Sequence, residues 1–207
     1  MENLKIGTRQ KAAGVVSSIS HPLYVAPPAI LAVSLRSSEG IAAGFYWWGL
    51  YLVFSALVPI ADLIWRRKSG RITDWHISNR EERVWPLVFG MIYAGAGFSV
   101  FRVLSAPLIL QASLLAGLAM SALVLAITYF WKVSLHLLGN SSLAVILYWG
   151  FRLHPLSPAV FIMAFYLLAV AASRFVVKAH TIPQIITGAL LGGGVTWIIM
   201  VVTGVTH

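Results

Sequence analysis

Residues 107–131 read PLILQASLLAGLAMSALVLAITYFW, a stretch without a single charged side chain. An α-helix rises about 1.5 Å per residue, so about 20 apolar residues cross the hydrocarbon core of a bilayer. Comparable stretches recur near 17–36, 42–65, 86–104, 134–151, 156–173 and 182–203. The sequence therefore predicts an all-α integral membrane protein, a helical bundle with about six to seven transmembrane helices.

The composition agrees with a membrane protein and excludes several kinds of chemistry. Hydrophobic residues make up 59% of the chain and charged residues only 10%, far from the balance of a soluble domain. The chain has no cysteine, which excludes disulfides, thiolate metal sites and cysteine nucleophiles. The first residues carry Lys5, Arg9 and Lys11 without a compact apolar core, so we interpret 1–16 as a basic tail rather than a signal peptide.

The basic residues are distributed unevenly between the two expected faces. With seven crossings, the N-terminus, the polar connection 66–85 and the segments 132–136 and 174–180 share one face. Twelve of the fifteen Lys and Arg residues lie on that face, and only Arg36, Arg102 and Arg152 lie on the other. The positive-inside rule then places the shared face and the N-terminus in the cytoplasm. The run Arg66-Arg67-Lys68 is interpreted as a topology anchor at anionic lipid.

Two polar islands interrupt the apolar sequence on the shared face. One is Lys132-Val133-Ser134-Leu135-His136, and the other runs from Ser173-Arg174 to His180. Charged and imidazole side chains are costly at a membrane boundary and commonly mark function there. Taken singly, Arg174 is better explained as a snorkelling anchor and His136 as a hydrogen-bonded interfacial histidine. Their conjunction at helix starts on one face favours a common site.

That common site has the features of a phosphate site. Helices are expected to start after Arg83, at Ser134 and near 182, and helix N-termini suit anions. Arg80, Arg83, Lys132 and Arg174 add full positive charges that match phosphate oxygens. We interpret His180 as the nucleophile that forms a phosphohistidine, and His136 as the general acid and base. Gln184, one helical turn beyond His180, is placed to orient its ring.

The motifs resemble those of the type 2 phosphatidic acid phosphatase (PAP2) superfamily, membrane enzymes that hydrolyse lipid phosphates. The third motif of that family, SRxxxxxHxxxD, is similar to Ser173-Arg174-FVVKA-His180-TIP-Gln184. The second, PSGH, is similar to Val133-Ser134-Leu135-His136. The nearest match to the first, KxxxxxxRP, is Asn79-Arg80-Glu81-Glu82-Arg83-Val84-Trp85-Pro86. The resemblance covers residues 74–200 and leaves the first two expected helices outside it.

The resemblance implies a division of the chain and a role for each motif residue. It implies a PAP2-like core at 74–203, preceded by the tail at 1–16 and by two leading helices with a basic loop at 17–73. His180 is implied to be the nucleophile and His136 the acid, with no cofactor and no metal. Arg174, Ser173, Ser134 and Arg83 or Arg80 are implied to hold the phosphate.

This chain departs from the family pattern at two points. Gln184 stands where the family has the carboxylate that orients the nucleophilic histidine, and no lysine precedes Arg80 or Arg83 by seven residues. Asp74 or Glu81 could supply an orienting carboxylate, and Lys132 could replace the motif lysine. If Asp74 is the substitute, Asp74→Asn abolishes turnover.

Three functions remain open from the sequence. The first is a metal-independent phosphatase acting on a lipid phosphate or prenyl diphosphate. The second is a catalytically degenerate relative that binds lipid or assembles with a membrane-protein partner or with further copies of itself. The third is a lipid phosphotransferase. Nucleic acid is not an expected partner because the basic residues form no single domain. A Mg²⁺-dependent prenyltransferase is disfavoured because paired acidic motifs are absent from the sequence.

Overall fold

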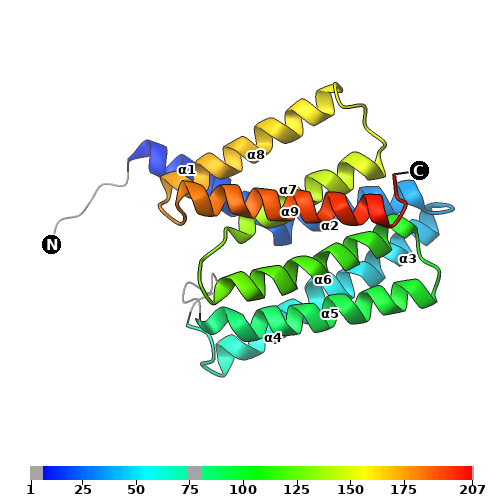
Figure 1. The fold of residues 1–207 in the computed structure, drawn as a ribbon, viewed down its shortest axis with the longest axis horizontal. Coiled ribbons are helices and arrows are strands. Elements are labelled where there is room, and N and C mark those ends of the chain that lie inside the picture. The colour runs from blue at the N-terminus through cyan, green and yellow to red at the C-terminus, as the bar shows by residue number, and fades with distance from the viewer. Residues whose placement is uncertain (1–6, 74–80, 207) are drawn as a thin grey trace.

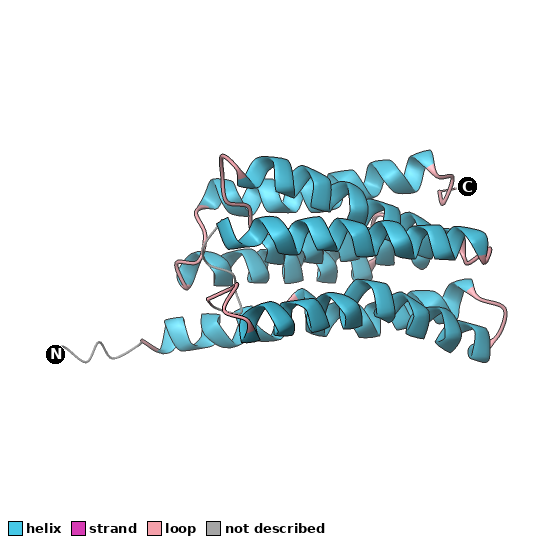
Figure 2. Cartoon of the chain, turned by 90° about the horizontal axis from the view of Figure 1, so that it is seen from below, coloured by secondary structure: helices cyan, strands magenta, loops and turns pink. Residues whose placement is uncertain are grey.

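The fold is a bundle of helices, seen in a computed structural model that describes residues 7–73 and 81–206 (Figures 1 and 2). No strand occurs among these residues. The all-α prediction is therefore confirmed for the described chain. The elements are α1 (Thr8–Ile19), α2 (Pro22–Ser37), α3 (Ile41–Leu52), the π-helix η1 (Val53–Leu57), α4 (Val58–Lys68), the 3₁₀ turn η2 (Glu81–Arg83), α5 (Val84–Val103), α6 (Leu108–Thr128), α7 (Leu135–Gly150), α8 (Pro158–Val176) and α9 (Ile182–Val202).

Five helical segments of the described chain are long and apolar enough to cross a membrane. They are Ile41–Lys68, Val84–Val103, Leu108–Thr128, Pro158–Val176 and Ile182–Val202. The pair α1 and α2, bent by 46°, makes a sixth if it is counted as one span. The remaining expected span, 134–151, corresponds to α7 (Leu135–Gly150). This helix forms at the predicted place but has only 16 residues. Large apolar side chains such as Phe161, Phe165 and Leu168 are exposed, as expected of a lipid-facing surface.

The leading segment is helical further towards the N-terminus than the sequence suggested. Helix α1 starts at Thr8, inside the expected tail, and α2 continues through Pro27 and Pro28. The indole Nε1 of Trp48 donates to the carbonyl of Pro27 at 2.9 Å and so joins α3 to α2. The bend falls between the two helices, where His21 caps α2 by accepting from the backbone N–H of Leu23.

Arg66 contacts the bundle rather than only anchoring it. Its Nε lies 2.7 Å from a carboxylate oxygen of Asp62, and its guanidinium lies 4.7 Å from the centre of the Phe89 ring. The Arg66 side chain is buried. The residue therefore joins α4 to α5, and of the basic run only Arg67 and Lys68 keep the exposed positions expected of topology anchors.

Helices α7 and α9 pack together at two glycines. A Cβ atom on Gly188 would lie 2.5 Å from the carbonyl oxygen of Ser134, and one on Gly192 would lie 2.0 Å from that of Leu138. Only hydrogen fits at such distances, so the spacing of four residues sets how closely α9 approaches α7. Gly188 and Gly192 are therefore the positions at which α9 packs closely on α7.

Replacing Gly192 with alanine is expected to destabilise the protein by at least about 2 kcal/mol, because the backbone of α7 must move away. Thermal unfolding in detergent measures the loss. Gly194→Ala is the matched control, since a Cβ there meets nothing within 4 Å. Similar melting temperatures for the two variants would contradict the observed approach of the helices.

The polar islands lie at one end of the bundle. The C-terminal ends of α4, α6 and α8 and the N-terminal ends of α5, α7 and α9 gather there, with α1 beside α8 (Figure 1). The expectation that the two polar islands lie at the same end is confirmed. The contacts of α1 with α8 and of α2 with α7 attach the leading helices to the part of the chain that carries the motifs.

Candidate functional site

The turn between α8 and α9 positions His180. Helix α9 begins with Thr181 as its N-cap, and Pro183 occupies its first turn, where a missing N–H costs nothing. The Thr181 side chain and the Gln184 side chain form a capping box with the backbone. The segment next to His180 is therefore held by local hydrogen bonds.

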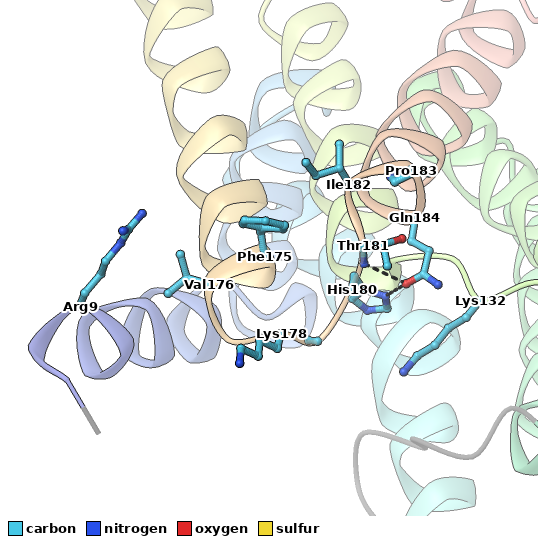
Figure 3. A pocket seen from close by; sticks show the side chains of 11 residues that line it. Arg9, Lys132, Phe175, Val176, Lys178, His180, Thr181, Ile182, Pro183 and Gln184 are labelled. Atoms are coloured by element: carbon cyan, nitrogen blue, oxygen red, sulfur yellow. Dashed lines mark hydrogen bonds between the residues drawn. The ribbon is translucent and has the colours of Figure 1, made fainter. Parts of the chain in front are cut away.

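The hydrogen bonds of Gln184 determine which nitrogen of His180 carries a proton. Oε1 of Gln184 accepts the backbone N–H of Thr181 at 3.2 Å, so this atom must be the amide oxygen. The same oxygen lies 3.1 Å from Nδ1 of His180 (Figure 3). Because an amide oxygen only accepts, Nδ1 must donate, and Nε2 of the neutral ring carries the lone pair. This is the tautomer that a nucleophilic histidine requires.

An open pocket of about 820 Å³ surrounds this histidine. Lys132 lies on one side of His180, Lys178 lies below it, and Arg9 of α1 stands at the far edge (Figure 3). No Asp or Glu of the described chain lines the pocket. Three cationic side chains and the N-terminus of α9 therefore give the pocket a positive potential that suits a phosphate.

The start of α7 lies directly against the start of α9. The backbone N–H of Ser134 donates to the carbonyl oxygen of Gln184 at 3.2 Å. The Ser134 hydroxyl is fully buried, and its Oγ has no hydrogen-bond partner among the described residues. A buried hydroxyl without a partner costs about 1–3 kcal/mol.

His136 and Arg174 converge on Ser17, in the last turn of α1. Nε2 of His136 lies 3.2 Å from the Ser17 carbonyl oxygen, which only accepts, so this nitrogen carries the proton. Nη1 of Arg174 donates to the hydroxyl of Ser17, while the buried Nε of Arg174 has no partner within the described part of the chain. The rings of His21 and His136 meet edge to face at 4.9 Å.

The structure therefore divides the predicted site residues into two groups. His180, Gln184 and Lys132 line the pocket. Ser134 adjoins them through Gln184, but His136 and Arg174 face Ser17 and are not among the lining residues. Ser173 is buried and donates to the carbonyl of Val170 in its own helix at 2.7 Å.

The predicted residues before α5 cannot be placed in the same way. Asp74 and Arg80 lie outside the described residues. Arg83 ends the turn η2, which leads directly into α5 at the same end of the bundle. Among the described residues, no group of three or more His, Cys, Asp or Glu is placed to hold a metal ion.

Two contributors were not predicted from the sequence as part of this site. Ser17 belongs to an apolar-looking segment and is joined to Arg174 only by the fold. Asn140, one turn after His136, donates to the carbonyls of Ser20 and His136 at 2.9 and 2.8 Å and accepts from the hydroxyl of Tyr166 at 2.7 Å. The spacing of His136 and Asn140 by four residues in an apolar helix was a signal for a buried polar face.

Replacing Ser17 with alanine is expected to destabilise the protein by about 1–3 kcal/mol, because the guanidinium of Arg174 loses its acceptor while remaining half-buried. Thermal unfolding measures the change. Ser18→Ala is the control, since its hydroxyl only bonds the Gly14 carbonyl of its own helix. Equal stability of the two variants would contradict a significant Ser17–Arg174 bond.

Comparison with known proteins finds no match: no family model, no curated protein and no solved structure matches this chain. The likeness to the PAP2 superfamily therefore rests on the motif residues alone.

Proposed function

We propose that this protein is a membrane phosphatase that hydrolyses a lipid phosphate or prenyl diphosphate through a phosphohistidine at His180. One observation carries the proposal. His180 is held by Gln184 in its nucleophilic tautomer, in a positively charged pocket at the end of an apolar helical bundle. A phosphate is the anion for which such a pocket is suited, and the surrounding bundle suits an apolar chain.

Two buried donors without partners support a phosphate between the two groups of residues. They are the Ser134 hydroxyl and Nε of Arg174, and both belong to the residues predicted from the sequence to hold the phosphate. A phosphate oxygen satisfies such donors with charge-assisted bonds, about twice as strong as bonds to a neutral acceptor. The Ser17 hydroxyl, a neutral acceptor for Arg174, is the weaker partner.

The proposed reaction has two steps. The lone pair of His180 Nε2 attacks phosphorus, the bond from phosphorus to the leaving oxygen breaks, and His136, acting as an imidazolium, donates one of its two ring protons to that oxygen and becomes neutral. His136 then takes a proton from water, whose oxygen attacks phosphorus. The P–N bond breaks, and inorganic phosphate and the original neutral His180 result. The cationic side chains of the site stabilise the charge on the transferring group, a task that needs no metal ion.

The orientation of the site is part of the proposal. The described end that carries the pocket also carries Arg67, Lys68 and Lys178, so the positive-inside rule favours a cytoplasmic site. A cytoplasmic site suits a biosynthetic substrate such as phosphatidate or a prenyl diphosphate.

Purified protein in detergent tests the function directly. We expect phosphate release from farnesyl diphosphate or phosphatidate, and equal release when EDTA is present. Release that requires a divalent ion would refute the metal-independent mechanism. No release from either substrate or from a wider lipid panel, with a monodisperse protein, would refute the phosphatase proposal.

Gln184→Glu is expected to raise the rate of phosphate release about tenfold. A glutamate keeps the length of the side chain and can still accept from Thr181 and His180. Its charge additionally stabilises the positive imidazole that forms as Nε2 attacks. Single-turnover kinetics measures the effect, and Gln184→Met, which cannot accept these bonds, is the opposite control. A lower rate in Gln184→Glu than in the natural protein would contradict the orienting role.

A second function is favoured by the contacts of Ser17. His136 and Arg174, the expected acid and a main phosphate ligand, are both bonded to Ser17 in this structure. A protein that uses these residues to attach α1 would bind lipid phosphate at the pocket without turning it over. Binding of phosphatidate vesicles that is unaffected by His180→Ala, together with absent phosphate release, would identify this binding protein.

A further inference from the structure

A second cavity, of about 260 Å³ and partly open to the surroundings, lies between helices of the bundle. Its walls come from α2, from α3 with η1, from α6 and from α7. The lining residues are Pro22, Leu23, Ala26, Pro27, Ile30, Tyr51, Leu52, Ser55, Ala56, Ser113, Gly117, Met120, Gly139, Ser142, Leu143 and Ile146. Neither His180 nor the cationic residues of the first pocket belong to this lining.

The three serines in this lining have hydrogen-bond partners within the protein. Ser55 donates to the carbonyl of Tyr51 at 2.8 Å, and Ser113 donates to that of Ile109 at 2.6 Å. The Ser142 hydroxyl is paired with that of Thr196, at 2.7 Å. A ligand therefore meets serine hydroxyls that are already bonded, beside mostly apolar side chains. Such a wall suits hydrocarbon, whereas an ordered water needs about two to four polar partners.

Small residues keep the space open from several sides. Ala26, Ala56, Gly117 and Gly139 stand at positions where larger side chains would fill it. A Cβ added to Gly117 would meet nothing within 4 Å. Ala56 lies in the π-helix η1, and π-helical turns are frequently found at functional sites. The small residues that leave this cavity unfilled therefore come from four elements, α2, η1, α6 and α7.

One end of this cavity adjoins the proposed acid. Pro22 follows His21 directly, and His21 contacts the ring of His136. Gly139 lies one turn after His136 on α7, and a Cβ there would lie 2.9 Å from the Pro22 ring. In the proposed reaction, His136 protonates the leaving oxygen. The group attached to that oxygen therefore starts next to Pro22 and Gly139.

We propose that the cavity holds the first part of the hydrocarbon chain of the substrate, attached to the oxygen that leaves. This inference rests on the proposed function and adds to it a substrate with a single slender chain at the leaving oxygen, such as a prenyl diphosphate. The cavity has the volume of about nine water molecules of the liquid, which is room for part of one hydrocarbon chain.

Filling the cavity tests this assignment. Gly117→Leu places a side chain into the space from α6, and Ala56→Leu does so from η1. Gly194→Leu on α9 is the matched control, since its Cβ also meets nothing within 4 Å and it does not line the cavity. Phosphate release is measured in mixed micelles with farnesyl diphosphate and with dimethylallyl diphosphate, whose chain is short. Stabilisation by farnesol is measured by thermal unfolding in parallel.

Both filling variants are expected to lower kcat/KM for farnesyl diphosphate about tenfold relative to dimethylallyl diphosphate, because about two methylene groups lose their contacts. They are also expected to lose the stabilisation by farnesol that the natural protein and Gly194→Leu show. An unchanged ratio between the two substrates in folded variants would overturn the chain site while leaving the phosphatase intact.

The farnesol measurement separates this proposal from the proposed function. If the natural protein releases no phosphate, the phosphatase fails, and stabilisation by farnesol that only the filling variants lose still supports a chain site. Equal stabilisation of all variants overturns it. Farnesol bound equally by all variants would mean that only the surrounding lipid surface takes it up.

Discussion

His180→Ala is expected to reduce phosphate release by more than about a thousandfold, because the attacking atom is removed and the remaining groups only bind and polarise the phosphate. In the proposed reaction Nε2 of the neutral His180 ring attacks phosphorus, while Nδ1 keeps its hydrogen bond to the Gln184 side chain. The ring is half-buried at the pocket surface, so its loss leaves the helix cores untouched. Release of inorganic phosphate from farnesyl diphosphate and phosphatidate is the measurement.

His154→Ala provides the matched control for this variant. His154 is exposed in the connection between α7 and α8, which lies at the end of the bundle opposite the pocket (Figure 1), and its Nδ1 accepts the backbone N–H of Leu156. A phosphoenzyme that is labile to acid and stable to base should be trapped in the natural protein and in His154→Ala, and be absent from His180→Ala. A His180→Ala protein that keeps normal turnover would refute the phosphohistidine.

Arg174→Lys is expected to lower phosphate release about a hundredfold, the usual cost of losing one positioned donor at the transferring group. A lysine keeps the charge but loses the planar fork and the Nε donor, which is buried without a partner in the described structure. The variant retains a donor for the Ser17 hydroxyl, so the attachment of α1 should largely persist. Turnover and thermal stability are therefore expected to respond differently.

Arg152→Lys at the opposite end of the bundle is the control for Arg174→Lys. It should leave both turnover and stability unchanged. If Arg174→Lys lowers the melting temperature strongly without changing turnover per folded molecule, Arg174 serves to hold α1 and not the phosphate. That result would favour the lipid-binding function over the phosphatase.

Local patterns in the sequence were sufficient to predict the helices and the contact of His180 with Gln184. The long apolar runs specify helices because, in a bilayer, a single segment can satisfy its own backbone polar groups only as a helix. His180 precedes the N-cap Thr181, so its pairing with Gln184 comes from the capping box, in which the Gln184 side chain folds back over the start of α9, and not from the helical turn that the spacing suggested. The common face of the polar islands followed from counting crossings, and it survives the short length of α7 because the direction of each helix is unchanged.

What the sequence by itself determined is therefore the helical bundle, the shared face and the local geometry at Thr181 to Gln184. Only the tertiary structure decided that His136 and Arg174 share Ser17 as a partner, across 119 and 157 positions of sequence. It also decided where a cavity remains between helices of the bundle. In a membrane, both the lipid-facing and the core-facing sides of a helix are apolar. The pattern of apolar residues therefore does not reveal which side turns inward, and long-range partners emerge only when the helices pack.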